Sequence, residues 1–217
     1  MEKTTIAMIL LILLAFSLSI YFYPQMPEEM ASHWNARGEV NGYMPKFWGS
    51  FLMPLITLGL VGMFLVLPKI DPLKKNYSLF KNYYNGMVLV FIVFFFYIHA
   101  ISIVANLGFA FNMSYLILPP MALLFLFIGY ILPRCKRNWF VGIKTPWTLS
   151  SDNIWNKTHK LGGKLFMIYG AFILAMMLFY DTVVEYFAWI IIGPVLALSV
   201  FLFIYSYYEY WKETVKR

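Results

Sequence analysis

Hydrophobic residues form six long runs along the chain, and the stretches between them hold nearly all the charged residues. A helix that crosses the hydrocarbon core of a bilayer needs about 20 mostly apolar residues, and its backbone groups must be hydrogen-bonded within the segment. Each run is therefore predicted to be a transmembrane helix. The six runs cover residues 4–23, 48–67, 86–109, 115–132, 162–180 and 186–208.

The predicted fold class is all-α, a polytopic membrane protein with six transmembrane helices. The length of 217 residues fits a single six-helix domain, 1–217. The chain is 61% hydrophobic and only 12% charged, whereas about 25% of the residues in a soluble domain are charged. The net charge of +7 does not predict nucleic-acid binding, because the distribution of the basic residues has another cause.

Lysine and arginine are distributed unevenly between alternate loops. If the six helices alternate in direction, one side of the membrane carries 15 of these residues and the other carries 2, Arg37 and Lys46. Loops rich in Lys and Arg stay in the cytoplasm. Both termini and the loop 133–161 are therefore predicted to be cytoplasmic, and the loop 24–47 extracytoplasmic. The predicted location is the cell membrane, as a multi-pass protein.

The extracytoplasmic loop carries more structural signals than a connector needs. Pro27, Glu28 and Glu29 predict a short helix, since proline lacks the N–H that is unpaired in a first turn and acids complement the helix dipole there. Glu29 and His33 would lie one turn apart on that helix. Two ligands without a third do not make a metal site, so no metal is predicted. Gly38 favours a turn.

Two interpretations of this loop remain open. In the first, the loop is a small lid that presents His33, Trp34, Asn35 and Tyr43 to a ligand, with a second turn at Gly42. In the second, it is an interfacial helix whose Trp34 and Tyr43 lie at the level of the lipid headgroups, where these residue types are common.

The cytoplasmic loop mixes cations with three tryptophans and a Thr-Pro turn. Ser150 or Ser151, followed by Asp152, predicts a helix start. The residues that follow predict an amphipathic helix along the inner leaflet, with its lysines toward lipid phosphates. The alternative is a docking face for a cytoplasmic protein. The apolar face comprises Ile154, Trp155, Thr158 and Leu161, and the lysines are Lys157, Lys160 and Lys164.

Polar residues within the hydrophobic runs are few. His99, Ser102 and Asn106 lie at spacings of three and four, which places them on one face of the third helix. An ionisable group in a transmembrane helix is a candidate functional site. The alternative is that His99 and Asn106 form hydrogen bonds between helices, as such residues commonly do.

No motif for catalysis is present. The sequence has neither a His-Glu-x-x-His motif nor a glycine-rich phosphate loop, and no carboxylate pair lies within a run. The single cysteine, Cys135, excludes an intramolecular disulfide and a thiolate metal cluster. The protein is therefore predicted not to be an enzyme and to carry no cofactor.

Each of the two long loops contains a distinctive motif. The first motif combines Pro27 with His33-Trp34-Asn35, Gly38 and Gly42-Tyr43. The second comprises Asn138, Trp139, Gly142, Lys144, Thr145, Pro146, Trp147, Trp155, Lys157, Thr158 and His159. With these motifs the chain resembles the SdpI family of membrane immunity proteins: the first is similar to the amino-terminal module of the family, and the second to the family signature, with Lys144 where many members carry Arg.

The resemblance implies a six-helix membrane protein that protects a cell against a secreted antimicrobial toxin. The first motif would then recognise the toxin. The second would form an ordered cytoplasmic platform, and a helix-turn-helix repressor is an implied partner beside membrane lipids. The alternative is a small transporter or permease that uses His99. Polar residues concentrate in the two loops rather than at the membrane midplane, which favours recognition of peptides or proteins.

Overall fold

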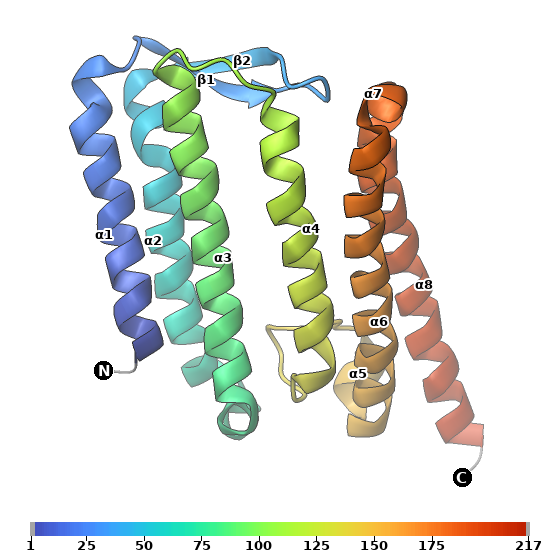
Figure 1. Ribbon diagram of the computed structural model, residues 1–217. Helices are drawn as coiled ribbons and strands as arrows, with labels where there is room; N and C mark the ends of the chain where they lie inside the picture. Colours follow the sequence, from blue (N-terminus) through green and yellow to red (C-terminus); the bar gives the residue numbers. More distant parts are fainter. Residues whose placement is uncertain (1–2, 216–217) are drawn as a thin grey trace.

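The computed structural model describes residues 3–215, apart from the side chains of Phe187 and Ala188, as a helical bundle with a β-hairpin at one end (Figure 1). Within this part, six helical segments are long and apolar enough to cross a membrane, which confirms the prediction of a mostly helical protein with six candidate transmembrane helices. They are Lys3–Gln25, Lys46–Ile70, Lys74–Asn106, Met113–Arg134, Asp152–Tyr186 and Trp189–Val215.

The long helices fall into two groups of three (Figure 1). The first group comprises α1 (Lys3–Phe22), α2 (Lys46–Ile70) and α3 (Tyr77–Asn106). The second comprises α4 (Met113–Ile131), α6 (Asp152–Met176) and α8 (Phe187–Val215). Contacts between α3 and α4 join the groups. Short elements complete the described chain: β1 (Glu29–Trp34), β2 (Val40–Pro45), α5 (Pro146–Ser150), α7 (Tyr180–Val183) and five 3-10 turns.

Glycines bring the backbones of α4 and α6 into direct contact. A Cβ atom on Gly129 would lie 2.6 Å from the carbonyl oxygen of Gly163, and one on Gly163 would lie 2.6 Å from that of Gly129. About two turns further along α6, a Cβ atom on Gly170 would lie 2.8 Å from the carbonyl oxygen of Ala122. Small residues at helix interfaces permit this close approach in membranes, where burial of apolar surface provides little driving force.

The two ends of the bundle differ. The hairpin of β1 and β2 covers one end, here named the hairpin end (Figure 1). Lys3, Val215 and α5 lie at the opposite end, named the platform end (Figure 1). Because α1 begins and α8 ends at the platform end, the described chain crosses the bundle an even number of times.

The predicted short helix after Pro27 is wrong, because residues 29–34 form strand β1. Its antiparallel partner is β2, with Met30 opposite Met44 and register irregularities near His33. The pairing supplies backbone hydrogen bonds that the local helix signals could not outweigh, and it buries the Met30 side chain completely. In an extended strand Glu29 and His33 lie about 13 Å apart, so they cannot share a metal ion.

The predicted helix start at Ser151 is confirmed. Its side-chain oxygen accepts a hydrogen bond from the backbone N–H of Ile154, and Asp152 lies in the first turn. The helix then continues without a break to Met176. The residues expected in a separate amphipathic surface helix are therefore the first turns of α6, and Trp155 and Thr158 are buried in the bundle.

Candidate functional site

The first strand of the hairpin is fixed to the first group of helices. The backbone of Ala31 forms two hydrogen bonds with the Asn106 side chain, at 2.7 Å to Oδ1 and 3.0 Å to Nδ2. Met30 is buried beneath the strand, where Ser50 Oγ lies 3.3 Å from its sulfur. A Cβ atom on Gly49 would lie 2.6 Å from Met30 Cβ. The hairpin is therefore held as a rigid cover over α2 and α3.

The turn of the hairpin contacts the second group of helices. The carbonyl oxygen of Ala36 accepts hydrogen bonds from Ser114 Oγ at 2.9 Å and from the Tyr180 hydroxyl at 2.5 Å. Asn112 Nδ2 donates to the carbonyl oxygen of Arg37 at 3.0 Å. The Arg37 guanidinium forms an ion pair with Glu185, which raises the pKa of Arg37. The hairpin thus bridges the two helix groups.

A glycine is required at position 38, where the hairpin turn packs against Asn112. Its φ of +79° lies in the left-handed region, and a Cβ atom would lie 2.3 Å from Asn112 Oδ1. Gly42 is restricted by its neighbour across the hairpin, because a Cβ there would lie 2.9 Å from His33 Cβ. Both glycines predicted in the loop therefore shape the hairpin, and neither contacts the space beneath it.

An open groove of about 340 Å³, here named the hairpin groove, lies between the hairpin, α4 and α8. Its polar groups come from the hairpin and from the start of α4, and its floor is apolar. The lining residues are His33, Trp34, Asn35, Ala36, Met113, Ser114, Ile117, Leu118, Met121, Ile191 and Ile192. A groove with this lining suits a ligand with an apolar face and some hydrogen-bonding groups.

The predicted recognition residues are only partly brought together. His33, Trp34 and Asn35 line the hairpin groove, and His33 Nδ1 lies 2.5 Å from Asn41 Oδ1. Asn35 is held by Glu39, whose carboxylate accepts its side-chain N–H at 2.8 Å. Tyr43 is not among the lining residues, and its side chain is mostly exposed on β2.

Two of the three polar residues of α3, His99 and Asn106, form hydrogen bonds with other elements. His99 Nε2 lies 3.0 Å from Ser19 Oγ on α1, and Ser19 donates to the carbonyl oxygen of Ser50 on α2 at 2.6 Å. Both side chains are fully enclosed. Ser102 accepts a hydrogen bond from Asn106 through its carbonyl oxygen and borders a cavity of about 160 Å³ beneath the hairpin. His99 therefore forms the predicted hydrogen bond between helices, whereas Asn106 bonds to strand β1 instead of a helix.

Asn138 organises the loop at the platform end, residues 135–151, which is named the platform loop. Its Oδ1 accepts hydrogen bonds from the backbone N–H groups of Phe140 and Val141, at 2.9 and 2.6 Å. Its Nδ2 donates to the carbonyl oxygens of Lys136 and Val141. Asp71 also accepts from the Trp139 backbone N–H at 2.9 Å. Since Asn138 and Asp71 are both buried, the loop has a defined shape.

The side chain of His159, on α6, holds the next part of the platform loop in place at Ile143. The backbone N–H of Ile143 donates to His159 Nε2 at 2.9 Å, and His159 Nδ1 lies 2.8 Å from the carbonyl oxygen of Trp155. Only the neutral imidazole with its proton on Nδ1 satisfies both bonds. Gly142 has a φ of +122°, and a Cβ atom there would lie 2.3 Å from His159 Nε2.

The tryptophans of the platform differ in exposure. Trp155 is buried, stacks on His159 with ring centroids 3.9 Å apart, and donates to the carbonyl oxygen of Cys135 at 2.9 Å. Trp147 packs against Phe203 of α8. Trp139 is 51% exposed. The platform loop is therefore packed against Trp155 of α6 and Phe203 of α8 on its inner side and carries the exposed side chain of Trp139 on its surface.

The pattern of the cytoplasmic loop predicts that Lys144, Lys157 and His159 are presented to a partner or to lipid phosphates. This is wrong for His159, whereas Lys157 is exposed. His159 is completely buried, because its ring supports the platform loop. Lys157 Nζ forms an ion pair with Glu209 at 2.7 Å. Lys144 is exposed, as expected.

The residues around the Thr-Pro turn are also structural. Pro146 is the first residue of α5, and Thr145 caps this helix through a reciprocal pair of hydrogen bonds with Thr148. Thr145 Oγ1 lies 3.0 Å from Ser206 Oγ on α8. Thr158 is buried, and among the described residues its hydroxyl has no hydrogen-bond partner.

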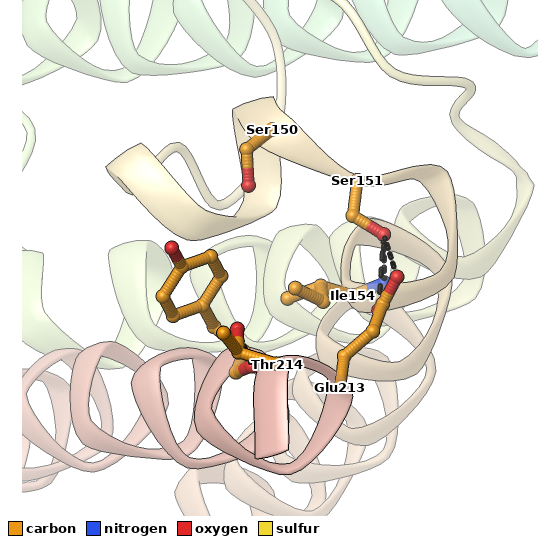
Figure 2. A pocket seen from close by; sticks show the side chains of 6 residues that line it. Ser150, Ser151, Ile154, Glu213 and Thr214 are labelled. Atoms are coloured by element: carbon orange, nitrogen blue, oxygen red, sulfur yellow. Dashed lines mark hydrogen bonds between the residues drawn. The ribbon is translucent and has the colours of Figure 1, made fainter. Parts of the chain in front are cut away.

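A polar pocket of about 260 Å³ lies beside the platform loop, between the start of α6 and the end of α8. Figure 2 shows the Ser151 side chain directed toward Glu213, to which its hydroxyl donates at 3.2 Å. Asn153 Nδ2 donates to the same carboxylate at 3.2 Å. These bonds attach α6 to α8, so the lining of the pocket has a structural role.

The carboxy-terminal part of the chain matches a known protein family, and the whole chain aligns with a known immunity protein. The model of the SdpI/YfhL protein family matches residues 134–206, which include the platform loop, α6 and much of α8. The Immunity protein SdpI of Bacillus subtilis (strain 168) is 26% identical over 210 residues, which cover 97% of each chain. The resemblance to the SdpI family is confirmed.

The amino-terminal part of the chain matches a different description. Residues 10–58, which include the hairpin, match a domain of unknown function (DUF1648). No solved structure matches the chain.

Sequence reasoning missed the residues of α4 and α8 that form the floor of the hairpin groove. Ile117 and Ile191 are separated from the hairpin by more than 70 residues and have no distinguishing pattern within their apolar runs. Asn112 did carry a signal. It precedes an apolar run and caps α4, accepting from the backbone N–H groups of Ser114 and Tyr115.

Proposed function

We propose that this chain is a membrane immunity protein that binds a secreted antimicrobial peptide in the hairpin groove. The alignment with the Immunity protein SdpI over 97% of the chain supports the immunity role. The observation that carries the proposed site is the groove itself, because Trp34 and Asn35 meet the apolar floor of α4 and α8 there.

The proposal places the hairpin end outside the cell. The segments at that end contain two of the 17 basic residues, Arg37 and Lys46, whereas the connections toward the platform end contain most of the others. Cytoplasmic loops are enriched in Lys and Arg. This distribution supports a cytoplasmic location of the platform end and of both termini.

The lining of the groove suits a membrane-active peptide. Ile117 and Ile191 offer apolar surface below the hairpin, and Asn35 and Ser114 offer hydrogen-bonding groups near it. A peptide bound there would place its apolar face against the helices and its backbone near the polar groups. Trp34 is the aromatic anchor, and buried anchors of this kind contribute about 2 kcal/mol or more.

The test compares Trp34→Ala with Tyr43→Ala, which changes an exposed aromatic residue of the same hairpin that does not line the groove. Cells that carry each variant are exposed to the toxin, and the amount of each variant in the membrane is measured by immunoblot. Trp34→Ala should weaken peptide binding about 30-fold at unchanged abundance, and Tyr43→Ala should protect normally. Equal effects of the two variants, or a parallel loss of abundance, would refute recognition in this groove.

The platform loop is proposed to relay the bound state to a cytoplasmic helix-turn-helix repressor. Its support is a rigid surface with exposed Lys144 and Trp139, held in place by Asn138. Lys144→Ala should abolish recruitment of the repressor to the membrane while toxin protection remains, because the hairpin groove is at the other end. Loss of both functions together would mean that Lys144 supports the fold.

The alternative of a transporter that uses His99 has weaker support. The His99 ring is enclosed by three helices and bonded to Ser19, whereas a transport site has to open to water on each side in turn.

A further inference from the structure

An apolar groove of about 350 Å³ runs between α3 and α4 on the side of the bundle. Its walls are almost entirely carbon. The lining residues are Val90, Val93, Phe94 and Tyr97 of α3, and Pro120, Leu123, Leu124 and Phe127 of α4. Val93 is 47% exposed and Leu123 is 59% exposed, so the groove is open to the hydrocarbon that surrounds the bundle.

The two helix faces that form the groove continue toward the platform end. On α3, steps of three and four residues lead from Val90 through Gly86 to Tyr83. On α4 a step of three leads from Phe127 to Tyr130, and Arg134 follows in the 3-10 turn at the end of that helix. Gly86 leaves this path open, since a Cβ there would be 3.9 Å from the nearest heavy atom, on Phe127.

Arg134 stands at the end of this path. Its guanidinium carbon lies 3.8 Å from the centroid of the Tyr130 ring and 5.7 Å from that of Tyr83. Its Nη1 donates to the carbonyl oxygen of Tyr130 at 2.5 Å. Within residues 3–215, no carboxylate forms an ion pair with it.

A cationic side chain at the edge of the hydrocarbon core is stabilised by a nearby anion, such as the phosphate of an anionic lipid. Stacking on the tyrosines holds the guanidinium in place, and its remaining N–H groups match the geometry of phosphate oxygens. Tyrosine side chains are also typical of the headgroup level.

We propose that Arg134 and the α3–α4 groove form a binding site for one anionic phospholipid. Its phosphate binds Arg134 between the rings of Tyr83 and Tyr130, and one acyl chain lies in the groove. At a rise of 1.5 Å per residue, the path from Tyr83 to Tyr97 is about 20 Å long. One leaflet of the hydrocarbon core is about 15 Å thick, so the path accommodates an acyl chain that begins at the phosphate. The site is independent of toxin recognition.

The test measures lipid retention by native mass spectrometry on the full chain, released from nanodiscs that hold equal amounts of phosphatidylglycerol and phosphatidylcholine. The wild-type protein should retain one phosphatidylglycerol. Arg134→Gln should lower the preference for phosphatidylglycerol about fivefold, since one basic residue near the surface contributes about that factor. The matched control, Lys69→Gln, removes an exposed cation in the last turn of α2 and should leave the preference unchanged.

Val93→Trp tests the groove separately. Val93 faces the bilayer, so the larger side chain can fill the groove without disturbing the core. This variant should retain less of both lipids. Equal loss of preference in Arg134→Gln and Lys69→Gln, or normal retention in Val93→Trp, would overturn the proposal, because either result indicates non-specific binding at the bilayer surface.

Discussion

Replacement of Gly142 by alanine tests how the platform loop is held. With a φ of +122°, an alanine would adopt a conformation that costs about 1–2 kcal/mol. Its Cβ would lie 2.3 Å from His159 Nε2 and 3.1 Å from the Trp155 ring. The imidazole must then move, which removes the hydrogen bond from the Ile143 N–H. An unsatisfied buried group costs about 1–3 kcal/mol, so the total destabilisation is about 2–5 kcal/mol.

Reversible unfolding in detergent micelles measures this change as the free energy of unfolding. Gly59→Ala is the control, because a Cβ atom at Gly59 meets nothing within 4 Å. Its free energy of unfolding should not fall, since alanine is favoured over glycine by about 0.5–1 kcal/mol inside a helix such as α2.

A double-mutant cycle isolates the clash. In a His159→Ala background the imidazole is absent, so Gly142→Ala should then cost only the backbone term of about 1–2 kcal/mol. Additive effects of the two substitutions, or wild-type stability of Gly142→Ala, would refute the contact between Gly142 and His159 as the reason for the glycine.

Three further predictions follow from other contacts. Gly163→Ala should lower the free energy of unfolding by about 2 kcal/mol through overpacking of α4 against α6, whereas Gly62→Ala, with nothing near its Cβ, should not. Cys135 should resist maleimide up to about pH 10 until the protein unfolds, because burial raises its pKa to about 12 and keeps the thiol protonated as the pH rises; rapid labelling of native protein would contradict this. Because the native Cys135 should not react, single introduced cysteines can report the topology. An impermeant maleimide should label Glu28→Cys and not Ser150→Cys in intact cells, and the reverse pattern would place the hairpin end in the cytoplasm.

The helices could be predicted from the sequence because the requirement that defines them is local. Each apolar run must satisfy its own backbone hydrogen bonds in hydrocarbon, so composition and length were sufficient. The cap at Ser151 is local in the same way, since the hydroxyl and the N–H of Ile154 are three residues apart.

The hairpin could not be predicted in this way. Pro27, Glu28 and Glu29 carry real helix-start signals, but the pairing of β1 with β2 and the burial of Met30 against α2 depend on contacts that local sequence does not encode. The same limit applies to His159, because its role depends on a hydrogen bond from the backbone N–H of Ile143, 16 residues away, to its Nε2 atom.

The hairpin groove is the clearest example of non-local information. The structure places His33, Trp34 and Asn35 along one groove, and their role in recognition stays a prediction. The other walls come from α4 and α8, whose isoleucines resemble all the other apolar residues of their helices. Only the packing of the hairpin against α4 and α8 distinguishes them.

Site-specific photocrosslinking tests the central proposal most directly. A photoreactive amino acid is introduced at Trp34, in the hairpin groove, and separately at Trp147, in the platform loop, and toxin is added to membranes that carry each variant. The proposal predicts a covalent adduct of the toxin with the Trp34 variant and none with the Trp147 variant. An adduct at Trp147 without one at Trp34 would contradict recognition at the hairpin end.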